Sequence, residues 1–357
     1  MNRLSWCIGV FAGIAALASC SKDDNPPAPP VPVAAGVYVL SEGVWNQNNT
    51  MLTYYDFSTQ TAATDYYRTV NNSGLGDTGN DMLIYGSKLY IVMNVSSYIE
   101  VADAATATSL KKVEMKDGGT ARSPRYAVPY KNKILISCFD GTVAVMDTAS
   151  LTLEKFIPVG ANPEQLLVDG DKLYVANSGS LNFVEPDSTI SIIDLTTMTQ
   201  TKKLVVGTAP AKLAIGKGKL FALCLGIYGT VPIKLVSVDL ATQTLSDDLE
   251  INAGVVRFFD NKLLLTSGYG GAPKITVLNP DDLTTISDNF ITDGTAVTTP
   301  YGLSINSEAN EVFVTDAKDY TSGGAVFCFD KDGKKKYSFS VSPAISPNTV
   351  VPVKKLQ

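Results

Sequence analysis

Residues 162–207 read NPEQLLVDGDKLYVANSGSLNFVEPDSTISIIDLTTMTQTKKLVVG and contain four short segments typical of β-strands. The segments span 165–168, 172–176, 189–194 and 201–206. Each is rich in β-branched and aliphatic side chains and is bounded by turn residues, which is the usual appearance of a strand in a single sequence. The stretch therefore predicts a unit of four antiparallel strands.

The same unit recurs along the chain. Its second strand usually begins with a lysine that four mostly apolar residues follow. The seven second strands begin at Gly36, Lys88, Lys133, Lys172, Lys219, Lys262 and Glu311. Successive copies are separated by 39 residues (Lys133 to Lys172) to 52 residues (Gly36 to Lys88). This interval, with four strands per copy, predicts an all-β fold, a seven-bladed β-propeller with four-stranded blades.

The first strand of most copies carries a second signature, a proline followed by a polar pair and an apolar run. The prolines are Pro124, Pro163, Pro210, Pro300 and Pro347, and the segments 80–84 and 254–258 take their place in the other two copies. The chain enters the fold at Gly36 with a second strand, and the missing first strand is found at 347–352. We therefore expect the C-terminal strand to join the N-terminal blade and close the ring.

The N-terminal residues resemble a targeting segment. Arg3 precedes an apolar run over 6–18, which is too short to span a bilayer and fits residues 1–19 as a signal peptide. The sequence Leu17-Ala18-Ser19-Cys20 resembles a bacterial lipobox, so Cys20 is the predicted lipidation site. Residues 20–35 then form a predicted proline-rich tether, and 36–357 the propeller. The expected location is the outer membrane, anchored by lipid and facing the cell exterior.

Composition excludes several classes of function. The chain has 357 residues, no histidine and a formal net charge of −6. The absence of histidine removes the usual general base and the commonest metal ligand. Nucleic acid is not an expected partner, because no basic cluster stands out. We predict no metal, no cofactor and no catalytic residue.

Two sets of residues favour structural interpretations. An acid or its amide ends each third strand, and its place before a turn predicts that it caps backbone N–H groups. These residues are Asp56, Asp103, Asp147, Asp194, Asp239, Asn279 and Asp330. Three cysteines lie in the predicted propeller, Cys138, Cys224 and Cys328. We expect them to be unpaired, buried and small hydrophobic side chains.

Several segments resemble known propellers. YVAN (174–177), SIID (191–194) and VG (206–207) resemble the YVTN-type repeat of seven-bladed propellers, and residues 38–56 resemble surface lipoproteins of Bacteroides-type bacteria. These include the BtuG-type proteins, which capture vitamin B12. The resemblance covers residues 36–357. It implies a binding protein that takes a corrinoid such as cobalamin as its ligand and delivers it to an outer-membrane TonB-dependent transporter.

Loop lengths indicate which face would bind such a ligand. The connections from second to third strands vary in length and are rich in Gly, Asn and aromatic residues, at 41–50, 177–188, 225–232, 268–273 and 317–324. In antiparallel blades these loops share one face with the connections between blades. Variable loops on a uniform scaffold are a usual place for binding. We call this the variable-loop face.

The predicted ligand contacts are aromatic, amide and cationic residues of that face. Aromatic rings supply contact area, and amides supply hydrogen bonds. The residues are Trp45, Asn46, Asn48, Arg122, Arg125, Asn177, Phe183, Tyr228, Tyr269 and Tyr320. Arg122 or Arg125 is expected to bind the phosphate of the corrinoid nucleotide loop by paired hydrogen bonds.

Two other classes of function remain open from the sequence. A propeller lyase, lactonase or glycosidase would act through carboxylates such as Glu42, Glu185, Asp187 or Asp316. A scaffold that binds proteins or glycans would instead present an uninterrupted apolar patch.

Overall fold

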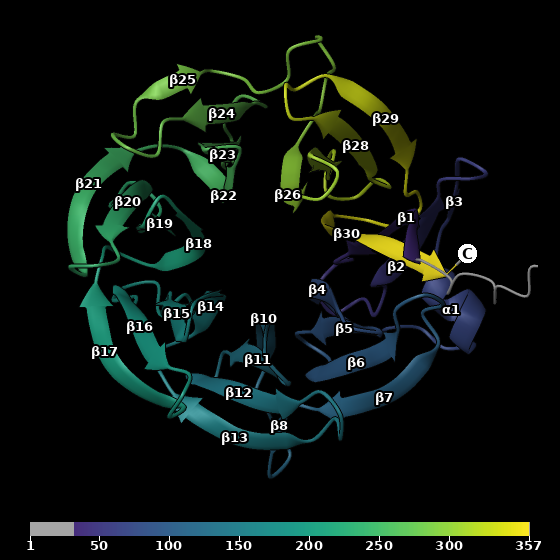
Figure 1. The fold of residues 1–357 in the computed structure, drawn as a ribbon, viewed down its shortest axis with the longest axis horizontal. Helices are drawn as coiled ribbons and strands as arrows, with labels where there is room; N and C mark the ends of the chain where they lie inside the picture. Colours follow the sequence, from purple (N-terminus) through teal and green to yellow (C-terminus); the bar gives the residue numbers. More distant parts are fainter. Residues whose placement is uncertain (1–31, 357) are drawn as a thin grey trace, which may run out of the picture.

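Seven antiparallel sheets of four strands surround a central axis in the computed structural model, which describes residues 32–356 (Figure 1). The prediction of a seven-bladed propeller with four-stranded blades is confirmed. In every blade the first strand lies nearest the axis and the fourth lies at the rim. The first strands are β30 (Pro347–Leu356), β4 (Gly79–Tyr85), β10 (Pro124–Tyr130), β14 (Pro163–Asp169), β18 (Pro210–Gly216), β22 (Ala253–Phe259) and β26 (Pro300–Asn306).

The outer strands complete each blade in chain order. Blades one to three add β1 (Pro32–Ser41), β2 (Met51–Asp56) and β3 (Thr61–Ala63); β5 (Lys88–Met93), β6 (Tyr98–Asp103) and β7 (Ser109–Glu114); and β11 (Lys133–Cys138), β12 (Thr142–Asp147) and β13 (Leu153–Pro158). Blades four and five add β15 (Lys172–Asn177), β16 (Thr189–Asp194) and β17 (Thr199–Val205); and β19 (Lys219–Cys224), β20 (Lys234–Asp239) and β21 (Thr244–Glu250). Blades six and seven add β23 (Lys262–Ser267), β24 (Ile275–Leu278) and β25 (Thr285–Ser287); and β27 (Glu311–Asp316), β28 (Ala325–Asp330) and β29 (Lys335–Ser340).

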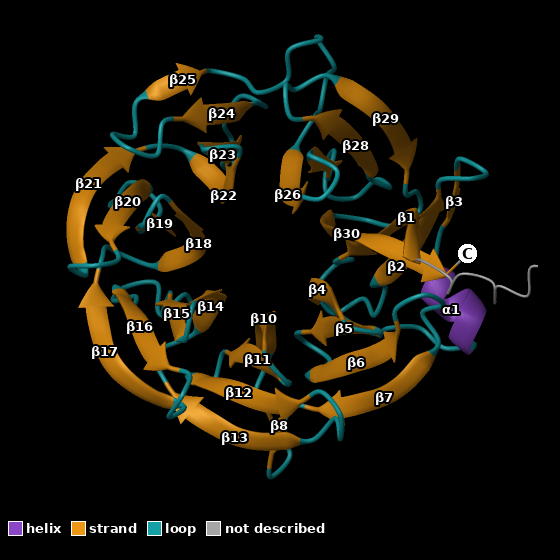
Figure 2. Cartoon of the chain, in the orientation of Figure 1, coloured by secondary structure: helices purple, strands orange, loops and turns teal. Residues whose placement is uncertain are grey.

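Two small elements lie in the connections between blades. Helix α1 (Tyr66–Asn71) follows blade one, and the hairpin of β8 (Lys116–Asp117) and β9 (Thr120–Ala121) follows blade two (Figure 2). Among residues 32–356, no helix has the length and apolar character needed to span a membrane.

The two ends of the chain share blade one. β30 is its innermost strand and pairs antiparallel with β1, with Val39 opposite Val350. The predicted closure of the ring is thereby confirmed. β1 begins at Pro32, four residues before the predicted start, because the segment continues to pair with the end of β30, where Val33 faces Lys355. The predicted signal peptide, Cys20 and most of the predicted tether lie outside the described residues.

The second strands show why the blades stack. Leu173, Tyr174, Val175 and Ala176 of β15 are all buried although they alternate in direction. A blade is covered on both faces by its neighbours, so the strand needs a continuous apolar run rather than an alternating one. The buried side chains accordingly form seven clusters, one between each pair of adjacent blades.

The acids that end the third strands cap turns, as the sequence predicts. Asp194 accepts hydrogen bonds from the backbone N–H groups of Thr196 (2.7 Å) and Thr197 (3.3 Å). The same pattern recurs at Asp103, Asp147 and Asp239. Hydrogen bonds that favour the charged form hold the pKa of Asp194 below its usual range. These acids are therefore structural.

The cysteines are also structural. Cys138, Cys224 and Cys328 are free and buried, as predicted. Burial raises the pKa of Cys224 and of Cys328 to about 12. A thiol that stays protonated at neutral pH is a poor nucleophile.

Candidate ligand-binding site

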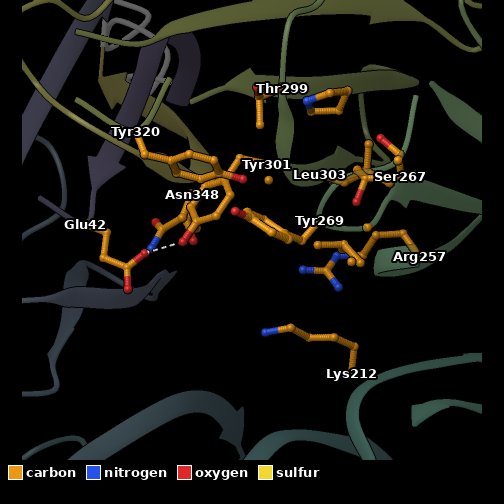
Figure 3. A pocket seen from close by; sticks show the side chains of 18 of the residues that line it. Glu42, Lys212, Arg257, Ser267, Tyr269, Thr299, Tyr301, Leu303, Tyr320 and Asn348 are labelled. Carbon is orange, nitrogen blue, oxygen red and sulfur yellow. Dashed lines mark hydrogen bonds between the residues drawn. The ribbon is translucent and has the colours of Figure 1, made fainter. Parts of the chain in front are cut away.

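A cavity of about 730 Å³ opens at the centre of the variable-loop face. Its wall is made by the starts of the first strands, and its rim by loops that join second to third strands, especially 268–273 (Figure 3). This volume lies within the range of about 300–1,000 Å³ that is typical of small-molecule sites. The cavity is therefore the leading candidate for a ligand site among the described residues.

The polar pairs of the first strands build the wall. The residues of these pairs that line the cavity are Asn80 and Asp81, Arg125 and Tyr126, Lys212, Tyr301, and Asn348 and Thr349. In every blade the pairing of the first with the second strand shifts register at this point. Such bulges redirect side chains, and they are common beside functional sites. Here they place the polar pair against the axis.

Some members of these pairs hold neighbouring blades together. Asp81 accepts a hydrogen bond from the backbone N–H of Ala127 (3.0 Å), and Gln165 accepts one from Leu213 (2.9 Å). Asn348 donates to the carbonyl oxygen of Gly79 (2.8 Å). The inner edge of each first strand has no further strand beside it, so these side chains satisfy its backbone groups.

Three tyrosines lie on one side of the cavity. The rings of Tyr301 and Tyr320 meet edge to face, with centroids 5.7 Å apart, and Tyr269 lies beside them (Figure 3). The Tyr301 hydroxyl donates to Glu42 at 2.6 Å. Tyr269 is 87% exposed and Tyr320 is 38% exposed, so both present ring surface to a ligand. We call Tyr269, Tyr301 and Tyr320 the tyrosine group.

Cationic side chains enter the cavity from other blades, and they differ in their partners. Arg125 forms a bidentate ion pair with Glu164, at 3.0–3.2 Å, and its guanidinium lies 4.7 Å from the ring centroid of Phe139. Lys212 donates to the hydroxyl of Tyr126, and Arg257 donates to the carbonyl oxygen of Val256 at 2.9 Å. Neither Lys212 nor Arg257 forms an ion pair with a carboxylate within residues 32–356.

Asp81 is the titratable acid of the axial wall. Burial raises its pKa to about 6, although the hydrogen bond from Ala127 and the charges of Arg257 and Lys212 act in the opposite direction. A carboxyl group with this pKa exchanges its proton near neutral pH. Its charge therefore changes with the pH near 6.

The structure brings three of the predicted ligand contacts to the cavity. Arg125, Tyr269 and Tyr320 line it. Trp45, Phe183 and Tyr228 are exposed on other loops of the same face, by 71%, 81% and 98%. They are not among the residues that line the cavity.

The other four predicted contacts are Asn46, Asn48, Arg122 and Asn177, and they are not among the residues that line the cavity. The side chains of Asn46 and Asn48 are exposed, and their backbone N–H groups bond to the buried carboxylate of Asp77. Arg122 pairs with Asp140 and with Asp117, and its guanidinium lies 3.8 Å from the ring centroid of Phe156.

Asn177 is fully buried. It accepts from Gly160 at 3.0 Å and donates to Thr189 and Ser191 at 2.9 and 3.0 Å. These contacts give it a packing role in blade four.

Two of the four carboxylates named for an enzyme are engaged by backbone groups. Asp187 accepts from the backbone N–H groups of Ala161 and Thr189, and Asp316 accepts from those of Thr298 and Thr299. Glu185 is exposed on its loop. Glu42 lines the cavity. Among residues 32–356 no group of three metal-ligating side chains is brought together.

Sequence reasoning missed the axial residues Asp81, Tyr126, Lys212, Arg257 and Tyr301. The signal was present for most of them, because they lie in the first-strand segments that form the second signature of the repeat. A polar pair that recurs in most blades is easily taken for a structural motif. The charges of its members differ from blade to blade, however, and such variation is typical of residues that line a cavity. Arg257 lies beyond the pair and carried no such signal.

Comparisons with known proteins establish the family and the fold. The family model described as "Domain of unknown function (DUF5074)" matches residues 35–348. A comparison with curated proteins finds no match.

Solved structures with similar folds include a quinonprotein alcohol dehydrogenase-like protein from Bacteroides thetaiotaomicron (14% identity, 90% of this chain and 79% of that one, TM-score 0.67). A protein from Lactobacillus plantarum (16% identity, 90% and 100%, TM-score 0.63) and the hydrazine synthase of Kuenenia stuttgartiensis (16% identity, 71% and 77%, TM-score 0.58) are similar too. At these identities the likeness concerns the fold alone.

Proposed function

Since the chain belongs to the DUF5074 family, a domain of unknown function, we propose from the site itself that the protein is a binding protein whose axial cavity captures a corrinoid such as cobalamin. The observation that carries the proposal is the cavity of about 730 Å³ with the tyrosine group on one side and polar groups around it. Apolar ring surface with a few convergent polar groups is the usual composition of a ligand site. The corrinoid comes from the resemblance of residues 38–56 to the B12-capturing propellers.

The shape of the cavity suggests how a corrinoid would lie. A corrinoid is a broad macrocycle edged with amide side chains, and it exceeds the space that the cavity encloses. We propose that one edge of the ligand enters the cavity and that the macrocycle rests on the exposed ring of Tyr269 and its loop. Amide side chains would then meet hydrogen-bonding groups such as Glu42 and Asn80.

The exposed apolar side chains of the same face support the proposed transporter contact. These exposed side chains are Trp45, Phe183, Val184 and Tyr228, which lie on three loops of the variable-loop face. Aromatic side chains are enriched where proteins bind one another. Delivery to an outer-membrane TonB-dependent transporter would bring this face against the partner. Lipid attachment at Cys20 would hold the protein at the outer membrane.

Catalysis is the second candidate function, and one observation favours it. Asp81 lies in the cavity with a pKa of about 6, which suits a general base near neutral pH. Binding without turnover is preferred, because Asp81 also accepts the Ala127 N–H and so has a structural use.

Calorimetric titration of the purified protein with cyanocobalamin tests the proposal. We expect saturable binding of one ligand per chain, and the recovered ligand should be chemically unchanged. Absence of binding heat and of any spectral change at high micromolar ligand would contradict corrinoid capture. A modified ligand after incubation would favour the catalytic alternative.

A further inference from the structure

Two cationic side chains in the axial cavity have no anionic partner. Lys212 comes from blade five and Arg257 from blade six, and both face the cavity (Figure 3). Within residues 32–356 neither forms an ion pair, whereas Arg125 in the same cavity is matched by Glu164. The difference is marked in a chain whose formal net charge is −6.

Arg257 is the more deeply placed of the two. It is the fifth residue of β22 and is half-buried, and burial lowers the pKa of its guanidinium although the group stays charged. Its only hydrogen bond to the described residues goes to the carbonyl oxygen of Val256. A guanidinium has five N–H donors, so most of the donors of Arg257 are unused by the described residues.

Lys212 and Arg257 are half-buried, and an unpaired charge removed from bulk water is costly, so proteins usually match it. Asp81 is a candidate partner within the fold, because the charges of Arg257 and Lys212 both act on its pKa. Yet Asp81 accepts the N–H of Ala127 and forms no ion pair with either cation among the described residues. The two cations are therefore available to a ligand.

We propose that Lys212 and Arg257 form an anion subsite in the wall of the cavity, which binds the phosphate ester group of an organic ligand. The planar guanidinium donates two parallel hydrogen bonds to phosphate oxygens, and the ammonium adds a compact charge. The apolar part of the ligand then lies against the tyrosine group nearer the mouth. The inference rests on the proposed function only in placing the ligand in the same cavity.

The subsite replaces the phosphate contacts expected from sequence. Arg122 is paired with Asp117 and Asp140, and Arg125 with Glu164, so neither has a free fork of donors. Binding a phosphate there would require an existing ion pair to break. Lys212 and Arg257 need no such exchange.

Phenyl phosphate and phenol are the probes for this subsite, because they share the aromatic ring and differ in the anion. Calorimetry and phosphorus NMR should show phenyl phosphate binding to the protein at least about tenfold more tightly than phenol. In Lys212→Met/Arg257→Met that preference should disappear.

Lys217→Met is the matched control, since Lys217 follows the same strand β18 at the opposite face and pairs with Asp281. It should bind phenyl phosphate as the unmodified protein does. Circular dichroism checks that each variant is folded. Should the double variant fail to fold, Lys212→Met alone serves, with an expected loss of at least about threefold.

Two results would overturn the subsite. One is equal affinity for phenyl phosphate and phenol in the unmodified protein. The other is a folded double variant that binds phenyl phosphate as tightly as the unmodified protein does.

Cyanocobalamin separates this inference from the proposed function. If the protein binds phenyl phosphate and does not bind cobalamin, corrinoid capture is contradicted and the subsite is retained. Equal affinity of the unmodified protein and the folded double variant for both cobalamin and phenyl phosphate would leave corrinoid capture in place and contradict the subsite.

Discussion

Asp81 shows how a single side chain can join the scaffold to the cavity. It accepts a backbone hydrogen bond from the next blade and also lies within the influence of Lys212 and Arg257. Its pKa of about 6 in the folded protein exceeds the usual value of 3.8. The protonated form therefore favours the folded state. This stabilisation is complete below about pH 4 and is lost as the pH rises through 6.

We predict that Asp81→Asn removes this pH dependence. Relative to the variant, the unmodified protein should lose up to about 3 kcal/mol of unfolding free energy between pH 4 and pH 7. Urea denaturation of both proteins at the two pH values measures the difference. A difference that stays constant with pH would show that the carboxyl group titrates normally.

Asn177 was predicted from the sequence to contact the ligand from a loop, whereas in the structure it is buried in blade four. We predict that Asn177→Ala lowers the unfolding free energy by about 2–3 kcal/mol, because the N–H of Gly160 and the hydroxyls of Thr189 and Ser191 lose their partner. Phe183→Ala in the same loop, where the ring is 81% exposed, should be as stable as the unmodified protein. The reverse order of stability in urea would contradict this assignment.

At the scale of elements, strands and turns were predictable because their signals are local. The apolar run of β15 and the turn at Asp194 specify their own conformations, so their repetition identifies the blade. The axial wall was harder to predict, because it depends on how inner-strand residues of several blades meet around the axis. Lys212 and Arg257 are 45 residues apart in the chain, and the packing of the inner strands of blades five and six brings both to one cavity.

The C-terminal strand is the element on which that closure depends. β30 pairs with β1, and Val353 is fully buried between blades one and two. We predict that Val353→Ser lowers the unfolding free energy by about 2–4 kcal/mol, because a hydroxyl replaces buried apolar surface. Lys354→Ser, an exposed neighbour that pairs with Glu308, should change it by less than about 1 kcal/mol. Equal stability of the two variants in urea would show that the strand adds little to closure.

At the scale of the whole molecule, the uniform turns and the variable loops lie on opposite faces of the propeller. The turns capped by third-strand acids are uniform and lie opposite the cavity, whereas loops of unequal length surround its mouth. The sequence therefore predicted the correct face for a cavity without identifying most of its lining. A binding loop can be recognised in the sequence by its unusual length. A lining residue on an inner strand cannot be recognised in this way, because it follows the same pattern as the repeat around it.

The central claim is that the ligand binds in the axial cavity beside the tyrosine group and not elsewhere on the variable-loop face. Tyr269 and Tyr228 offer a matched pair, since both are exposed, by 87% and 98%, and only Tyr269 lines the cavity. Calorimetric titration of Tyr269→Ala and Tyr228→Ala with cyanocobalamin is the most direct test. We predict at least about tenfold weaker binding for Tyr269→Ala and unchanged binding for Tyr228→Ala. Unchanged affinity in Tyr269→Ala with a loss in Tyr228→Ala would contradict the account.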